Sequence, residues 1–294
     1  MGLFPNELPR LTHRAKAERV AKWLRDHPQL AVSNENRLSK QCRLITETKD
    51  VVQDDHKQWR IFVQSLKDVQ EFWFIIGELG EDLVQPPFLD CLARSLKDAP
   101  HPADSGADTP GRNTQFELFL AAIAKRAGLM VSNRGGAGAD WILNASQERW
   151  SLEAKRIKSV EKMKRHIEKA ASQIIESQIG GVIAIDLSLA CNPDCKPLSR
   201  FFPDSEIDKA HGVRLNAFVD EYRKSIVEGV GAANVGFVLL HDFVIRPALA
   251  TSPTRESWGL IELWGKVDML SVDSTSRPHY DRLWQSLEAA VPNL

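Results

Sequence analysis

Two short segments combine carboxylates and an amine at spacings suited to metal-assisted hydrolysis. In segment 150–157 the side chains alternate as they do in a strand, which places Glu153 and Lys155 on the same face. Asp140 follows a glycine-rich turn and opens the apolar run 141–143. If these two runs pair, an Asp, a Glu and a Lys surround one point. Mg²⁺ and Mn²⁺ prefer oxygen ligands, and such a cation polarises a phosphoryl oxygen and activates water, so the pattern predicts phosphodiester hydrolysis.

Each of these residues also has a purely structural interpretation. Glu153 and Lys155 would form an ion pair on a solvated sheet face, worth at most about 1 kcal/mol. Asp140 would be a turn aspartate after glycines. The coincidence of all three residue types in one place favours the functional interpretation.

The elements needed to position these residues can be predicted from apolar periodicity and turn residues. From residue 114 onward the order is helix, three strands, helix, strand, over 114–127, 129–131, 139–143, 150–157, 159–179 and 182–189. Beyond them we expect a helix, two strands and a last helix, over 207–227, 235–245, 260–267 and 280–290.

The first hundred residues have a different character. Apolar residues recur at helical spacing over 12–26 and 52–76, and the second helix should end at Gly77 or Gly80. The segment 99–112 gathers Pro, Gly, Ser and Asp without periodic apolar residues. The sequence thus predicts an N-terminal helical domain (1–98), a linker (99–112) and an α/β domain (113–294).

The pattern of Asp140, the apolar run 141–143 and Glu153-Ala154-Lys155 resembles the PD-(D/E)xK nuclease superfamily, which includes restriction-endonuclease-like enzymes. The resemblance covers 114 to about 189, and Ala139 stands where the motif's name puts Pro. It implies a restriction-endonuclease-like αβββαβ core and a metal-dependent endonuclease. By analogy the substrate is DNA, with restriction or anti-phage defence as the setting.

The resemblance also implies roles for individual residues. Asp140 and Glu153 would bind Mg²⁺ or Mn²⁺, and Lys155 would position or activate the water. Glu117 from the preceding helix would complete the metal shell, and Gln173 from the following helix would position ligands or water. For Glu117 a second interpretation stays open, because Thr114 and Glu117 have the spacing of a helix capping box.

A basic stripe follows the candidate site. Lys162, His166, Lys169 and Gln173 recur at helical spacing. Between residues 153 and 169 there are seven Lys or Arg against three Glu, on a chain whose net charge is −1. We expect nucleic-acid phosphates to bind along this stripe and Lys158, with Arg134 in the glycine-rich turn as a second contact. The alternative is an ordinary solvated helix face.

The remaining features restrict the function classes. The net charge of −1 excludes a global basic field, so any nucleic-acid contact must be local. There is no signal-peptide pattern and no apolar stretch of roughly 20 residues, so we expect a cytoplasmic protein without a membrane partner. The helical domain should position the substrate, a partner protein or a second copy. The alternative function is a non-catalytic adaptor built on a nuclease-like fold, which binds nucleic acid or another protein.

Two further motifs are interpreted as structural. Cys191 and Cys195 lack a second Cys or His pair at supporting spacing, so we expect a loop without metal. His241 has no nucleophile motif near it and is interpreted as a hydrogen-bonded histidine on an edge strand.

Overall fold

The computed structural model describes residues 12–27, 36–48, 56–99, 110–132, 140–146, 148–197, 204–246, 259–269, 272 and 274–292. Its N-terminal part is helical, with α1 (His13–Asp26), α2 (Arg37–Glu47), α3 (His56–Leu79), the 3-10 segment η3 (Gly80–Val84) and α4 (Phe88–Ser95). Both predicted helices are confirmed. Gly77 does not end α3, which runs on to Gly80, a residue with the left-handed φ of +52° that favours glycine.

The rest of the described chain is mixed α/β. It comprises α5 (Pro110–Arg126), β1 (Met130–Ser132), β2 (Trp141–Ala145), β3 (Glu148–Arg156), the 3-10 segment η5 (Val160–Lys162), α6 (Met163–Ser177), β4 (Gly181–Asp186), α7 (Ser188–Cys191), α8 (Asp204–Val230), β5 (Val235–Arg246), β6 (Gly259–Asp268) and α9 (Arg277–Ala290). Each strand predicted from the sequence is present. Some boundaries are wrong: the strand predicted over 139–143 is β2, which begins after Asp140 and runs to Ala145, and residues 188 and 189 belong to the short helix α7 and not to the preceding strand.

The six strands form one open sheet in the order β1-β2-β3-β4-β5-β6. β1, β2 and β3 form an antiparallel meander, β3, β4 and β5 are parallel, and β6 returns antiparallel to β5. β4 is buried at every position, as expected for a parallel strand covered on both faces.

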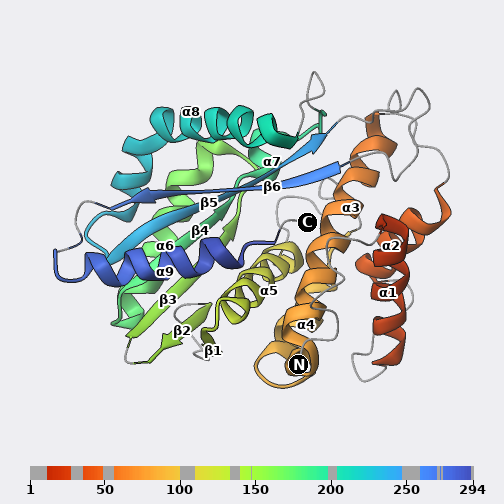
Figure 1. Ribbon diagram of the computed structural model, residues 1–294, viewed down its shortest axis with the longest axis horizontal. Helices are drawn as coiled ribbons and strands as arrows, with labels where there is room; N and C mark the ends of the chain where they lie inside the picture. Colours follow the sequence, from red (N-terminus) through yellow and green to blue (C-terminus); the bar gives the residue numbers. More distant parts are fainter. Residues whose placement is uncertain are drawn as a thin grey trace.

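Helices cover both faces of the sheet (Figure 1). α5 and α9 lie on one face, while α6 and α8 lie on the other, and α3 crosses beside α5. The alternation along β3 follows these layers. Ser151 faces α6, since its hydroxyl donates to the Ser177 hydroxyl over 2.6 Å, whereas Arg156 faces α3 and bonds Glu71.

The helical and α/β parts share one hydrophobic core. Buried side chains run continuously from Ala17 in α1 through the sheet to Ala290 in α9. α3 is buried along most of its length and lies between the first two helices and the sheet. Within the described residues, no helix has both the length and the apolar composition needed to cross a membrane.

Candidate active site

β3 presents Glu153 and Lys155 on the sheet face that α6 covers. The Glu153 side chain is fully buried, and the Lys155 side chain is 13% exposed. The Lys155 ammonium donates to Glu153 Oε2 over 2.7 Å. The sequence-based expectation that these two side chains point the same way is therefore met by a direct contact.

Asp140 lies immediately before β2 and next to Glu153. Its backbone N–H donates to Glu153 Oε1 over 2.8 Å, and its own Oδ2 accepts the backbone N–H of Ala154 over 2.8 Å. The Asp140 carboxylate is also 3.6 Å from the Lys155 nitrogen. Asp140, Glu153 and Lys155 thus meet at one point, because the antiparallel pairing of β2 with β3 brings the start of β2 beside Leu152 in the middle of β3.

Burial and the neighbouring charges shift the pKa values of Glu153 and Lys155. Burial, together with the nearby Asp140 charge, raises the pKa of Glu153 to about 8, although Lys155 partly opposes the shift. For Lys155 burial favours the neutral amine, but Asp140 and Glu153 outweigh it and raise the pKa above its ordinary value. Lys155 therefore remains an ammonium ion at neutral pH.

Glu117 reaches the same region from α5. Its backbone carbonyl accepts the Trp141 indole N–H over 2.9 Å, which fixes α5 against the residue that follows Asp140. Burial raises the pKa of the Glu117 carboxyl to about 8, with a further contribution from the Asp140 charge. A cation bound near this carboxyl would favour its ionised form and lower its pKa.

The capping-box interpretation of Glu117 is wrong. α5 begins at Pro110, four residues before Thr114, and the Thr114 hydroxyl donates to the Pro110 carbonyl inside the first turn. Proline suits a helix start because its fixed φ is already helical and its missing N–H would be unpaired there. The helix therefore begins within the predicted linker 99–112, and Glu117 lies in its second turn, free of a capping role.

The residues expected to bind nucleic acid are distributed around α6. Lys162 and Lys169 are exposed, and Lys158, His166 and Gln173 are half-buried. Burial lowers the pKa of His166, and the positive charge of Lys155 lowers it further, so His166 lies on the side of α6 that faces the site. Arg134 lies outside the described residues.

Sequence reasoning missed a contribution from α4. Phe88 at its start stacks on Trp141 with ring centroids 5.0 Å apart, which holds α4 against the beginning of β2. Arg94 is exposed, donates to Cys91 Sγ over 3.2 Å and feels the charges of Glu117 and Asp140. A cation from the helical part thus acts electrostatically on these two carboxylates. The sequence carries no local signal for it.

The metal set implied by the resemblance is only partly assembled. Among the described residues, no group of three or more His, Cys, Asp or Glu side chains is gathered closely enough to hold a metal ion. Lys155 contacts both Asp140 and Glu153, and each of these carboxylates also accepts a backbone N–H. The donors still fit a hard divalent cation, because they are carboxylates and because the raised pKa values of Glu117 and Glu153 show that Lys155 alone does not neutralise them.

No protein-family model, curated protein or solved structure matches this chain.

A buried ionic network lies directly behind the site, on the opposite face of the sheet. Arg156, next to Lys155, bonds Glu71 of α3 over 2.8 Å and Asp186 of β4 over 2.5 Å. Lys67 of α3 bridges the same two carboxylates, at 2.6 and 3.0 Å. All four side chains are at most 1% exposed. The network fixes α3 to the strand that carries Glu153 and Lys155.

His241 extends this network across the sheet. Its ring contacts Asp186 at 3.4 Å and forms a close contact with Glu262 of β6. Burial disfavours the imidazolium, but Glu262 and Asp186 outweigh it and raise the pKa of His241 to about 9. The interpretation of His241 as an edge histidine is wrong, because β5 lies between β4 and β6 and the ring is fully buried.

The two cysteines of the predicted loop lie near its ends. Cys191 closes α7 and Cys195 follows it, and both are free. Burial raises the pKa of Cys191 to about 11 and that of Cys195 to about 12, so both are thiols at neutral pH. The Cys195 carbonyl accepts the Trp59 indole N–H over 2.8 Å, which ties the loop to α3.

Proposed function

We propose that this chain is a metal-dependent nuclease that hydrolyses phosphodiester bonds in DNA. The observation that carries the proposal is the contact set in which Asp140 and Glu153 meet the Lys155 ammonium at 3.6 and 2.7 Å. The order α5, β1, β2, β3, α6, β4 agrees with the αβββαβ core that the resemblance to PD-(D/E)xK nucleases implies. Restriction or anti-phage defence is the setting we propose by analogy.

The carboxylates are the proposed metal ligands. Asp140 and Glu153 would hold Mg²⁺ or Mn²⁺, and Glu117 would complete the shell from α5. A bound cation would supply the Lewis acidity that polarises the phosphoryl oxygen and activates water. Ligation would also favour the ionised forms of Glu117 and Glu153, whose pKa values are now raised to about 8.

Lys155 has a different proposed role. Because its pKa is raised, it carries a proton at neutral pH and is placed as a hydrogen-bond donor. It therefore donates a hydrogen bond that orients the attacking water or phosphate, and its charge offsets the negative charge that develops on the phosphoryl oxygens. Gln173, half-buried on α6, would position the ligands or water, and His166, also half-buried there, would contact the substrate.

Incubation with DNA tests the proposal. Supercoiled plasmid, linear duplex and single-stranded DNA are each incubated with the full chain in Mn²⁺, in Mg²⁺ and in EDTA. Cleavage of at least one substrate that needs the divalent cation supports the nuclease. Binding of DNA without cleavage in either metal would favour the adaptor function instead.

A further inference from the structure

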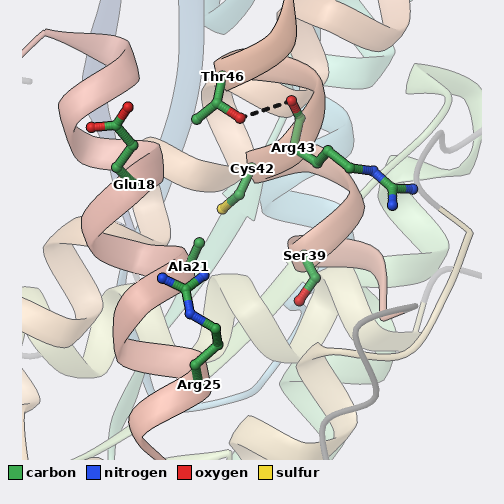
Figure 2. A pocket seen from close by; sticks show the side chains of 7 residues that line it. All are labelled: Glu18, Ala21, Arg25, Ser39, Cys42, Arg43 and Thr46. Atoms are coloured by element: carbon green, nitrogen blue, oxygen red, sulfur yellow. Dashed lines mark hydrogen bonds between the residues drawn. The ribbon is translucent and has the colours of Figure 1, made fainter.

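A second basic feature lies far from β3 in the sequence, between α1 and α2. These two helices enclose a groove of about 510 Å³ (Figure 2). Arg25 lines it from α1, and Arg43 and Thr46 line it from α2. Arg25 therefore comes from one wall and Arg43 from the other, and in Figure 2 the Arg43 guanidinium extends away from α1.

The helices around this groove are the most basic part of the described chain outside the α6 stripe. The described residues 12–27 and 36–48 contain eight Lys or Arg against three Asp or Glu, although the whole chain has a net charge of −1. Two of the eight, Lys16 and Arg37, are buried. The other six lie at or near the surface, which gives this small region a local positive potential.

Most of these cations already have partners, but the two in the groove do not form ion pairs. Arg14 bonds Glu18 over 2.6 Å, and Lys22 pairs with Asp26. Within the part of the chain that the structure describes, Arg25 and Arg43 make no ion pair. Both are exposed, and both line the groove.

The polar lining of the groove suits an anion. Ser39 adds a hydroxyl group from α2, whereas the Thr46 hydroxyl already donates to the Arg43 backbone carbonyl over 3.0 Å. Glu18, the carboxylate of the lining, is neutralised by its bond to Arg14. Guanidinium groups bind phosphate through paired N–H donors, and hydroxyls commonly add contacts to a nucleic-acid backbone.

The groove is rigidly connected to the candidate active site. Arg37 of α2 donates to Asp68 over 2.6 Å, to the Ser95 carbonyl over 2.7 Å and to Gln115 over 2.5 Å. Ser95 adjoins Arg94, and Gln115 lies two residues before Glu117 in α5. Buried hydrogen bonds therefore fix α2 to both helices that border the carboxylates.

We propose that the α1–α2 groove binds the phosphate backbone of the nucleic-acid substrate outside the cleavage site, through Arg25 and Arg43. This inference rests on the proposed nuclease function and assigns the N-terminal helices a role in holding substrate. Because phosphate contacts carry no sequence information, the groove contributes equally to binding of every DNA sequence.

The test is the salt dependence of DNA binding by the full chain in EDTA, where no cleavage takes place. A fluorescein-labelled duplex is titrated at several salt concentrations with wild type, Arg25→Glu/Arg43→Glu and Arg25→Ala/Arg43→Ala. Each phosphate contact contributes about 0.9 to the slope of log K against log salt, so losing two lowers the slope by about 2. We expect this reduction in both variants, because both arginines are lost in each.

A matched control distinguishes the loss of groove contacts from the effect of the changed net charge on DNA binding. Arg223 and Lys224 are exposed on α8, and Arg223→Glu/Lys224→Glu changes the net charge by the same amount as the groove reversal. The control should keep the wild-type slope. An unchanged slope in the groove variants, or an equal loss in the control, would overturn the groove proposal.

The same proteins are assayed for plasmid cleavage in Mn²⁺, so that the two proposals can fail separately. If wild type cleaves DNA and the groove variants keep its salt slope, the groove proposal fails and the nuclease stands. If binding depends on the two arginines but no cleavage occurs in any metal, the nuclease proposal fails and the groove remains a nucleic-acid site. If wild type does not bind DNA, the groove proposal is overturned.

Discussion

Asp140 and Glu153 are joined through the backbone, since the Asp140 N–H donates to Glu153 Oε1 over 2.8 Å. In return, Asp140 Oδ2 accepts the N–H of Ala154, the residue after Glu153. The separation of the two carboxylates is therefore set by the pairing of β2 with β3 and not only by side-chain rotamers. These backbone contacts fix the relative positions of the two carboxylates, although a bound cation would have to compete with Lys155 for them.

The first prediction concerns Glu153→Gln. Glutamine keeps the shape and can still accept the Asp140 N–H, but it removes a charged metal ligand. Metal affinity, measured by calorimetry, and DNA cleavage should fall together, and excess Mn²⁺ should restore part of the turnover. Unchanged metal affinity in this variant would remove Glu153 from the metal site.

The second prediction concerns Arg94, which is exposed and interacts electrostatically with Glu117 and Asp140. We expect its guanidinium to contact the phosphate being cleaved. Arg94→Ala should slow cleavage on the order of 10-fold or more while the protein keeps its unfolding temperature. Lys97→Ala, at a nearby exposed cation, is the control and should cleave like wild type. Equal rates in the two variants would assign Arg94 a structural role only.

The features that could be predicted from the sequence are those that depend on residues close together in the chain. The strand alternation that pairs Glu153 with Lys155, and the glycine-rich turn before Asp140, are short-range patterns, so the three residues were found together. Arg94 and the ionic network depend on contacts between distant segments. Lys67 and Asp186, for example, are 119 residues apart. The sequence of a helix does not show which distant residue will form an ion pair with a charged side chain that is buried. The start of α5 at Pro110, four residues before the predicted start, was also not visible in the spacing of apolar residues.

The third prediction concerns the stability of the network. Asp186→Asn preserves volume but leaves the buried cations Lys67 and Arg156 with Glu71 as the one carboxylate that they share, so the free energy of unfolding should fall by about 3–5 kcal/mol. Urea denaturation measures this. Asp194→Asn is the control, because Asp194 is 52% exposed and its ion pair with Arg60 is 3.5 Å long; it should change stability by less than about 1 kcal/mol. A similarly small effect at Asp186 would contradict the role given to the network.

The fourth prediction concerns pH. The pKa of His241 is raised from 6.5 to about 9, so the folded protein keeps a proton that the unfolded chain releases between these values. His241 therefore stabilises the fold below pH 6.5, and this contribution is lost as the pH rises through about 9. Urea denaturation from pH 6 to 9.5 should show a shallower loss of stability in His241→Gln than in wild type. If the stability of wild type and of His241→Gln changed with pH in parallel, the raised pKa inferred for His241 would be contradicted.

The most direct test of the central claim is plasmid cleavage by Lys155→Ala. The Lys155 ammonium is not a metal ligand, so its removal should leave metal affinity and DNA binding largely intact. It should slow Mn²⁺-dependent cleavage by on the order of 10² or more, because water positioning and charge stabilisation are lost. Excess metal should not restore the rate, in contrast to Glu153→Gln. Cleavage by Lys155→Ala at the wild-type rate would contradict the nuclease site proposed at Asp140, Glu153 and Lys155.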